Sequence, residues 1–354
     1  MKLQFNSENY ESLETYFIAD IAANHDGSLE RALELIRLAA ESGANAAKFQ
    51  NFKAETIVSA RGFKELGRND SHQSNWEKDV YSVYNDAELP LEWTDSLISE
   101  CEKNNIEYFT APYDLDYIDF FAEKMPYFKV GSGDITWSKS LERMAKTGKP
   151  ILLATGASEL KEIMEAVEKI LEFNVPLVLM QCNTNYTGQA NNLNYINLRV
   201  IKEFKELYPN LMIGLSDHSQ GHIAVLGAVA LGARVIEKHF TDDTKRKGPD
   251  HSFSLDPKMW KSMVEDTRRL EAALGDGKKK VEKNEIEARI VQRRALRYTR
   301  EMRKGEQIKE GDLISLRPCP PGSLEPSFEK ELIGKELVAD VSTQELVTRR
   351  HFEK

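Results

Sequence analysis

The stretch Ile213-Gly214-Leu215-Ser216-Asp217-His218, followed by Val235-Ile236-Glu237-Lys238-His239-Phe240, decides how this chain is expected to fold. Each piece is a short apolar run that ends in polar and ionisable residues. Between them, residues 221–231 have the pattern of an amphipathic helix. A strand, a helix and a second strand form the repeating unit of parallel α/β folds. The stretch therefore predicts two neighbouring parallel strands that both end in a histidine.

The same alternation runs through most of the chain. Short β-branched or aromatic runs predict strands at residues 16–22, 46–52, 106–112, 127–133, 150–156, 176–183, 211–218 and 235–240. Longer helical patterns predict helices at residues 28–42, 90–104, 115–124, 138–147, 159–173, 196–208, 221–231 and 257–274. Eight such units without a GxGxxG motif favour a closed (β/α)8 TIM barrel over an open, doubly wound sheet. The connection 53–89 is much longer than an ordinary βα loop, so we expect it to form a lid or a substrate loop.

The composition changes after residue 274. Residues 275–292 are charged and contain glycine, which is typical of a linker. Residues 293–354 contain short strands punctuated by glycine and proline, the pattern of a small β-clip domain. The sequence thus predicts a catalytic TIM barrel over residues 1–274, a linker, and a small β domain.

The composition also excludes several classes of function. The chain has 354 residues, of which 41% are hydrophobic and 30% charged, with a net charge of -9. These values are typical of a soluble globular protein and argue against nucleic acid or an anionic membrane as a partner. We find no signal-peptide pattern and no run of about 18 apolar residues. The three cysteines are not in CxxC spacing, so we expect a reducing, cytoplasmic environment and no cysteine zinc cluster.

The seventh and eighth predicted strands each end at or next to a histidine. Because the carboxyl ends of barrel strands meet at the active site, His218 and His239 are expected to lie close enough to share a divalent cation. Glu237 precedes the second histidine by two residues. The alternative is that each histidine has a structural role at its strand end. The metal site is favoured because two neighbouring strands end in the same way, with polar residues and a histidine.

Two lysines lie on the second and fourth predicted strands. A buried lysine needs either a carboxylate partner or an anionic ligand. In one interpretation Lys48 pairs with Asp20 or Asp134. In the other, Lys48, Lys129 and the turn 131–133 (Gly-Ser-Gly) hold the phosphate and carboxylate of a small anionic substrate. Because these residues accompany the histidine pair, the second interpretation is favoured.

These strand ends resemble those of the N-acetylneuraminate (sialic acid) synthase family. Its members condense phosphoenolpyruvate with an N-acylated amino hexose to form a nine-carbon, nonulosonic sugar acid. The matching stretches are ADIAANHDG (19–27), AKFQ (47–50), FKVGSGD (128–134), GLSDH (214–218), GAVALGARVIEKHF (227–240) and GPDH (248–251). Residues 293–346 resemble the family's antifreeze-like (SAF) domain. The resemblance covers nearly the whole chain, in the right order.

The resemblance implies a role for each residue. His218 and His239 would hold Mn2+ or Mg2+, which polarises the aldehyde of the open-chain sugar. The residues implied to contact phosphoenolpyruvate are Lys48, Lys129, Thr110, Ser132 and Ser216. Those implied to contact the sugar are Gln50, Asp134, Thr184, Tyr186 and Asp250. Asp20 stands at the family's catalytic carboxylate, and with Lys129 and Asp134 it forms the implied catalytic set.

The resemblance also implies a partner subunit. In the family the small domain caps the barrel of the partner, with an arginine that reaches the N-acyl group. Arg317 in LRPCPPG matches that arginine, which implies a domain-swapped homodimer. Two departures stand in the barrel: Asp20 where many members have glutamate, and Ala154 where a serine often contacts phosphoenolpyruvate. The resemblance leaves N-acetylmannosamine and a di-N-acetylated or 6-deoxy relative open as the acceptor.

Three other functions fit parts of the pattern. A class I aldolase would form a Schiff base between pyruvate and Lys48 or Lys129, without a metal, and the histidine pair argues against it. A 3-deoxy-sugar-phosphate synthase would need a second phosphate site, for which Arg61 and Arg68 on the long connection are the candidates. A carbohydrate-binding or ice-binding module would explain the C-terminal segment alone.

Overall fold

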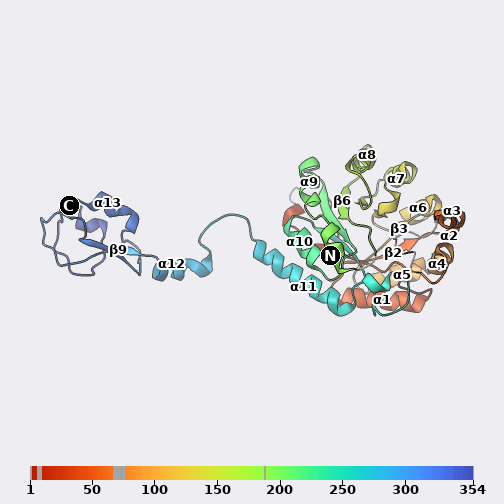
Figure 1. Ribbon diagram of the computed structural model, residues 1–354, viewed down its shortest axis with the longest axis horizontal. Coiled ribbons are helices and arrows are strands. Elements are labelled where there is room, and N and C mark those ends of the chain that lie inside the picture. Colours follow the sequence, from red (N-terminus) through yellow and green to blue (C-terminus); the bar gives the residue numbers. More distant parts are fainter. Residues whose placement is uncertain (1, 6–9, 67–72, 74–75, 187–188, 354) are drawn as a thin grey trace. The chain divides into compact units, whose positions relative to one another are not determined.

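The computed structural model describes residues 2–5, 10–66, 73, 76–186 and 189–353 (Figure 1). The chain divides into two compact units, Met1–Gly275 and Asp276–Lys354. Each unit has its own hydrophobic core, and each is described by itself below.

The first unit is a TIM barrel, as predicted. Its eight parallel strands are β1 (Tyr16–Asp20), β2 (Ala46–Asn51), β3 (Glu107–Pro112), β4 (Phe128–Val130), β5 (Ile151–Ala154), β6 (Leu177–Cys182), β7 (Met212–Asp217) and β8 (Val235–His239). The first strand pairs with the last, so the sheet curves round on itself in the order β3-β2-β1-β8-β7-β6-β5-β4. The two end strands, β3 and β4, lie next to one another. In the described residues no ladder of backbone hydrogen bonds joins them.

Helices surround the barrel on the outside (Figure 1). They are α1 (Leu29–Glu41), α5 (Thr94–Lys103), α6 (Leu115–Ala122), α7 (Ser138–Lys146), α8 (Leu160–Leu171), α9 (Val200–Leu207), α10 (Ile223–Ala230) and α11 (Pro257–Leu274). Helix α1 shows why they form. The Ser28 side chain accepts a hydrogen bond from the Arg31 amide and caps the first turn. Buried Leu35, Ile36 and Ala39 then recur at helical spacing on the face toward the strands.

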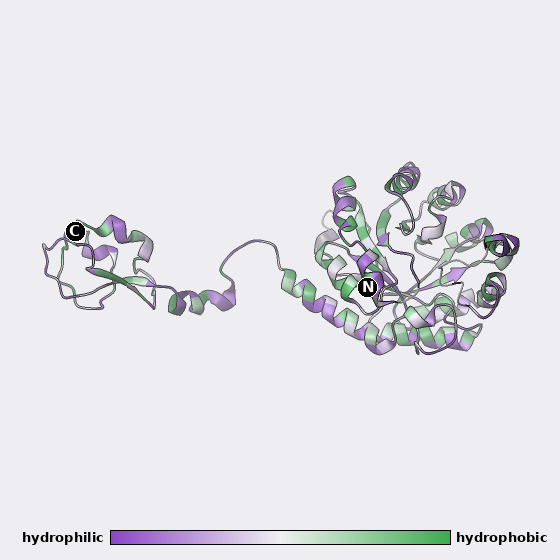
Figure 2. Cartoon of the chain, in the orientation of Figure 1, coloured by the Kyte–Doolittle hydropathy of each residue, from purple (hydrophilic) through white to green (hydrophobic). Residues whose placement is uncertain are grey.

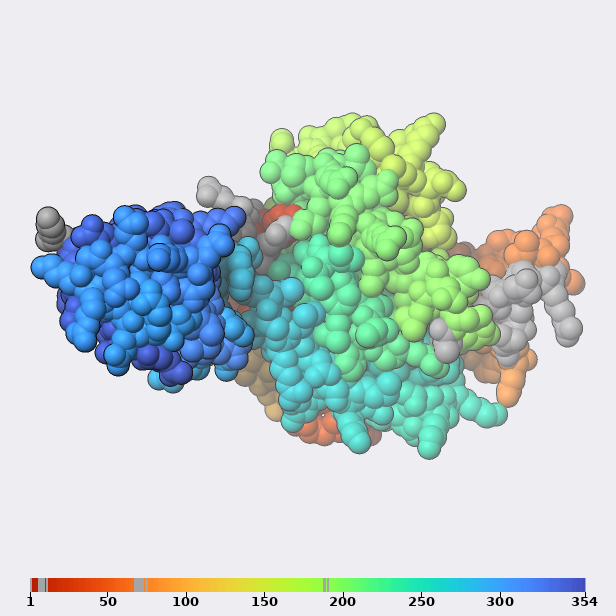
Figure 3. Space-filling view, turned by 60° about the vertical axis from the view of Figure 1, so that its left-hand side comes forward, coloured from red at the N-terminus to blue at the C-terminus, as the bar shows by residue number. Residues whose placement is uncertain are grey.

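Hydrophobic and hydrophilic residues also alternate along α11 (Figure 2), whereas α10 (IAVLGAVA) is apolar throughout. On the face shown in Figure 3, side chains of α9, α10 and α11 cover the strands. None of the helices in the described part of the chain has the length and hydropathy needed to cross a bilayer.

Several strands end earlier than predicted, and the fourth differs most. The fourth strand ends at Val130 rather than at residue 133, because a 3-10 turn, η4 (Ser132–Asp134), begins there. The long connection 53–89 is not a plain loop. It contains α2 (Ala54–Ile57), α3 (Ala60–Leu66) and α4 (Val80–Ala87).

The second unit is small and built from short elements. They are α12 (Ile286–Gln292), β9 (Ala295–Tyr298), β10 (Leu313–Leu316) and α13 (Glu329–Leu332), with β9 and β10 antiparallel. Its core contains Leu296, Tyr298, Met302 and Val347, among others. Part of the predicted linker is therefore helical, since α12 occupies its last seven residues.

Candidate active site

Four charged side chains meet inside the barrel, from β1, β2, β4 and β8. Lys48 Nζ lies 2.7 Å from Asp20 Oδ2 and 3.4 Å from Glu237 Oε1. Lys129 Nζ lies 3.4 Å from the same Glu237 oxygen. All four residues are buried. Two cations and two anions balance, which is the condition under which charges are tolerated in a protein interior.

The predicted pair of Lys48 and Asp20 is therefore present in the structure, and Glu237 is a second partner of Lys48. Glu237 had no predicted role. Its position two residues before His239, already evident in the sequence, puts both residues on one face of β8. The Ser216 hydroxyl donates to Glu237 Oε1 at 3.0 Å. Among the described residues, Glu237 Oε2 is buried with no hydrogen-bond partner.

The surroundings of the two carboxylates shift their pKa values in opposite directions. Burial opposes the charge of Glu237, but the two lysines outweigh it and lower its pKa to about 2. Burial dominates at Asp20 and raises its pKa despite the contact with Lys48. Burial also lowers the pKa of Lys129. Glu237 is thus the fixed counterion, and Asp20 is the carboxylate better suited to accept a proton.

Two glycines beside the cluster are required by close packing. A Cβ on Gly131 would lie 2.6 Å from the Tyr113 hydroxyl, and one on Gly156 would lie 2.5 Å from Thr184 Cγ2. The Gly156 amide donates to Ser132 Oγ at 2.9 Å. Backbone and hydroxyl groups therefore come together at the carboxyl end of β4, where they can donate to an anion.

The two histidines lie side by side, with ring centroids 5.4 Å apart. His218 Nδ1 is 2.9 Å from the Asn183 carbonyl oxygen. A carbonyl only accepts, so Nδ1 carries the proton and Nε2 keeps its lone pair. Burial lowers the pKa of His218 to about 3 and that of His239 to about 4. Both rings are therefore neutral at pH 7, the form that binds metals.

The donor set available to a metal is small. Among the residues described, no group of three or more His, Cys, Asp or Glu side chains is arranged to hold an ion. His239 Nδ1 is buried without a hydrogen-bond partner in the described part of the chain. The fixed tautomer of His218 is the orientation that metal-binding histidines usually receive from a second hydrogen bond. Two neutral imidazoles fit a divalent ion that takes its other ligands from water or substrate.

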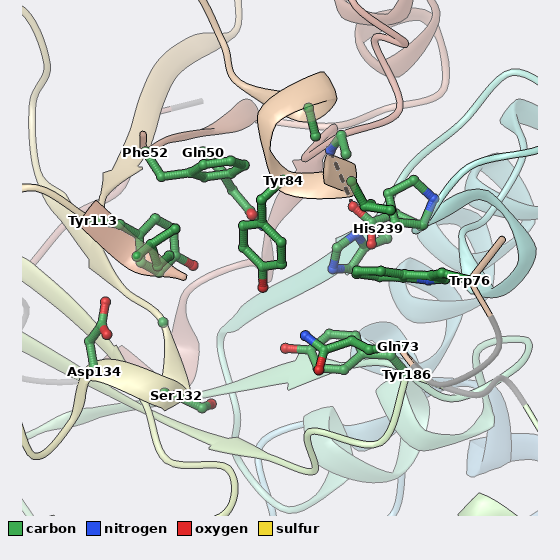
Figure 4. Close-up of a pocket in the computed structure, with 18 residues that line it drawn as sticks. Gln50, Phe52, Gln73, Trp76, Tyr84, Tyr113, Ser132, Asp134, Tyr186 and His239 are labelled. Atoms are coloured by element: carbon green, nitrogen blue, oxygen red, sulfur yellow. Dashed lines mark hydrogen bonds between the residues drawn. The ribbon is translucent and has the colours of Figure 1, made fainter. Parts of the chain in front are cut away.

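A cavity of about 320 Å³ adjoins the cluster (Figure 4). Gln50 lines it and donates to Asp20 Oδ2 at 3.3 Å, so it connects the cavity with the buried charges. Trp76 and Tyr84 line it from the long connection after β2. That connection therefore contributes directly to the site, as expected of a substrate loop.

The structure brings most of the predicted residues to this place. Those that line the cavity are Gln50, Ser132, Asp134, Tyr186, His239 and Asp250. Those in the buried groups around it are Asp20, Lys48, Lys129, Ser216 and His218, and the partly buried Thr184 lies against Gly156. Tyr186 joins the two sets, because its ring packs on His218 with centroids 4.2 Å apart.

Thr110 is not brought to the cavity. It is in register with Phe49, and alternation places both on the face opposite to Lys48. Its hydroxyl donates to Asn51 Oδ1 at 2.7 Å. On β3 the residue that shares the face of Lys48 near the strand end is Ala111, which has no hydroxyl.

Three arginines were also given predicted roles. Arg317 is exposed in the second unit. Arg61 is exposed and pairs with Glu65 at 2.6 Å. Arg68 lies outside the described residues. The second phosphate site of a sugar-phosphate synthase therefore gains no support from Arg61.

A hydrogen-bonded chain, missed in the sequence, ties together the loops after β1 and β8. Asp26 Oδ1 accepts from His251 Nε2 at 2.9 Å, so Nδ1 of the same ring accepts from the Thr241 hydroxyl at 2.7 Å. The Ala23 amide donates to Asp250 Oδ2 at 3.2 Å. His251 is fully buried. The chain fixes the loop that carries Asp250 at the cavity wall.

Comparison with known proteins gives consistent matches along the chain. A model of the NeuB family matches residues 35–279. The N,N'-diacetyllegionaminic acid synthase of Campylobacter jejuni is 35% identical over 337 residues, covering 94% of this chain and 98% of that protein. The N-acetylneuraminate-9-phosphate synthase of Homo sapiens is 31% identical, covering 94% and 91%. A solved structure, the putative spore coat polysaccharide biosynthesis protein E of Chromobacterium violaceum, matches with a TM-score of 0.76 and 25% identity over 96% and 100%.

Proposed function

Because this chain belongs to the NeuB family, we propose that it condenses phosphoenolpyruvate with an N-acylated amino hexose to give a nonulosonic acid and inorganic phosphate. The observation that carries the proposal is the pair of buried lysines, Lys48 and Lys129, beside a cavity that opens at the carboxyl ends of the strands. Buried cations in that position suit a small substrate with two anionic groups.

In the first half of the site, Lys48 and Lys129 would hold the phosphate and carboxylate of phosphoenolpyruvate. Ser132 and the turn 131–133 would add neutral donors. Glu237 already balances both lysines in the structure, so the anion would enter a site whose cations are in place. Preorganised cations need little rearrangement when the ligand binds.

The reaction would proceed at the boundary between the lysines and the cavity. C3 of phosphoenolpyruvate would attack the aldehyde carbon of the open-chain sugar, forming the C–C bond and leaving positive charge at C2. Water would add at C2 and pass its proton to Asp20, whose raised pKa makes it a stronger base than an ordinary aspartate. The tetrahedral C2 centre would then lose inorganic phosphate by C–O cleavage.

We further propose that His218 and His239 hold Mn2+ or Mg2+. The support is chemical: both rings are neutral, and His239 has a buried nitrogen that no described residue bonds. The bound cation would supply Lewis-acid polarisation of the aldehyde oxygen. The two imidazoles would hold it.

The metal proposal is tested by calorimetric titration with Mn2+. The unaltered protein should bind Mn2+ with high affinity, and His239→Ala should lose this binding. His222→Ala is the matched control, because His222 pairs with Asp266 at 3.0 Å away from the cavity and should leave the affinity unchanged. Equal Mn2+ affinity of His239→Ala and the unaltered protein would reject the site.

Two further features belong to the proposal. The small unit would be an SAF domain that caps the barrel of a partner subunit, with Arg317 reaching the N-acyl group in a domain-swapped homodimer. The location would be cytoplasmic, in keeping with three free cysteine thiols.

The deciding experiment measures phosphate release from phosphoenolpyruvate with Mn2+ across a panel of aldoses, with a chelator control. We expect release only with an N-acyl amino hexose, and an oxygen-18 label in the C2–O–P bridge should appear in the phosphate. Release only with a phosphorylated aldose would instead identify a 3-deoxy-sugar-phosphate synthase. No release, with borohydride trapping of pyruvate on a lysine, would identify a class I aldolase.

A further inference from the structure

A buried ion pair lies next to the two histidines, on the outer face of the barrel strands. Lys238 Nζ donates to Asp217 Oδ2 at 2.6 Å, and both side chains are buried. The two residues are register partners on β7 and β8. The next residue along the chain is in each case a histidine, His218 or His239. Because side chains alternate along a strand, the pair points away from the charge cluster that includes Glu237.

The same pair fixes the turn that carries His218. Strand β7 ends at Asp217, one residue before this histidine. Asp217 Oδ1 accepts from the Ser219 amide at 2.9 Å, and Asp217 Oδ2 accepts from the Ser219 hydroxyl at 3.0 Å. Lys238 Nζ donates to the Ser219 carbonyl oxygen as well as to Asp217. The residues on both sides of His218 are therefore joined to β8 through one ammonium group.

Stability alone does not account for this pair. Taking an ammonium group out of water costs free energy that its partner offsets only in part, and uncharged residues of similar volume are often as stable in its place. Ile236, on the same face of β8 as Lys238, is fully buried. The neighbouring helix α10, which packs on β7, is apolar throughout. An apolar side chain at position 238 would suit these surroundings, so the charge is better explained by the groups that it holds in place.

We propose that the ion pair of Asp217 and Lys238 positions the two active-site histidines, by setting the spacing at which both rings can reach one divalent cation. The inference rests on the proposed function and adds the residues that preorganise its metal site. Imidazole nitrogens lie about 2 Å from a bound ion, so the ends of β7 and β8 can shift little before one bond is lost. Outer residues that orient metal-binding histidines change metal affinity about 10- to 100-fold.

The first test removes both charges but keeps the side-chain volumes and the turn. In the double variant Asp217→Asn/Lys238→Met, the new amide oxygen can still accept from the Ser219 amide, whereas the link to β8 is lost. We expect this variant to bind Mn2+ at least about tenfold more weakly in calorimetric titration. Its affinity for phosphoenolpyruvate without metal should be unchanged, because the lysines inside the barrel keep their carboxylate partners. Its urea midpoint should stay close to that of the unaltered protein.

A matched control makes the same kind of change on the surface. Glu142→Gln/Lys146→Met removes an exposed ion pair on α7 and should leave both affinities unaltered. A loss of Mn2+ affinity alone in Asp217→Asn/Lys238→Met supports the positioning role. Equal Mn2+ affinity of this variant and the unaltered protein would overturn it. Equal losses for Mn2+ and phosphoenolpyruvate would also overturn it, because they would indicate general destabilisation.

A measurement without metal separates the inference from the proposed function. His218 Nδ1 lies 2.9 Å from the Asn183 carbonyl oxygen and carries the proton of the ring. Nitrogen-15 NMR of histidine-labelled protein, with the signal assigned by its absence in His218→Gln, should show this single tautomer in the unaltered protein. The double variant should show a mixture of both tautomers. If the unaltered protein binds no Mn2+, the proposed metal site fails and the tautomer decides the inference: a mixture in the double variant supports the positioning role, and the same single tautomer in both proteins overturns it.

Discussion

Glu237 balances two buried ammonium groups through a single carboxylate oxygen. Replacing it with glutamine would leave Lys48 and Lys129 with only Asp20 as a counterion. Glu237→Gln should therefore lower the free energy of unfolding by about 3–5 kcal/mol, the usual cost of breaking a buried ion pair. Urea denaturation measures the change.

The control for this prediction is an exposed ion pair. Glu142 pairs with Lys146 at 2.7 Å on the surface of α7, and Glu142→Gln should leave the urea midpoint nearly unchanged. Phosphoenolpyruvate should restore part of the loss in Glu237→Gln, because its anionic groups would replace the missing counterion. Coincident urea midpoints for Glu237→Gln and the unaltered protein would contradict the role of Glu237.

Asp134 gives a prediction on pH. Burial raises its pKa from 3.8 to about 6. Between these two values the native protein binds more protons than the unfolded chain, so the free energy of unfolding falls as pH rises. Asp134→Asn lacks this term. The stability of the unaltered protein relative to Asp134→Asn should therefore decline between about pH 4 and pH 6 and then level off, as followed by urea denaturation at a series of pH values. A difference that stays constant with pH would refute the shift.

At the scale of single residues, the period of two along a strand was sufficient to predict which side chains share a face, wherever the strand end was clear. The period of two puts Lys48 and Gln50 on one face of β2, and the structure brings both to the site. Thr110 shows where the rule needs more information. Whether Thr110 or Ala111 faces inward depends on the register with β2, and register is a property of paired strands rather than of one sequence.

At the scale of elements, the loops after β1 and β8 depend on one another through His251. Without its ring, the hydrogen-bonded chain from Asp26 to Thr241 is interrupted and the loop that carries Asp250 loses its anchor. His251→Ala should lower kcat/KM for the acceptor sugar about tenfold or more, and leave the KM for phosphoenolpyruvate nearly unchanged.

The steady-state kinetics of both substrates measure this split. His222→Ala again provides the control, since its ring lies outside this chain of hydrogen bonds. A loss in His251→Ala that falls equally on both substrates would indicate general destabilisation rather than positioning of Asp250.

Helices and strands with a strong periodicity in the sequence were predicted, and those with a weak periodicity were not. The eight strands and eight barrel helices were found because apolar runs and helical spacing alternate along the chain. The helices of the long connection, α2 to α4, were not found, because they are short, and residues of α2 and α4 line the cavity. Trp76 and Tyr84 consequently had no predicted role in the site, since their positions depend on contacts with residues distant in sequence.

At the scale of the whole molecule, the proposed domain-swapped dimer predicts complementation between subunits. Asp20→Asn would disable the barrel, and Arg317→Ala would disable the small unit. Each variant alone should be inactive. Subunits mixed in equal amounts and allowed to exchange should recover about a quarter of full activity, because half of the dimers then contain one intact composite site of two. Inactivity of the mixture, with exchange verified by mass, would show that each site is built from one chain.

The stretch between the units has a consequence for how such a site would be assembled. Every residue from 272 to 289 is exposed, so the small unit is joined to its barrel by a solvent-accessible tether. A tether of this length keeps its two ends at an effective concentration on the order of millimolar. The binding surfaces then need only weak intrinsic affinity for one another. Proteolysis at Lys278-Lys279-Lys280 would remove this advantage and make activity depend on dilution.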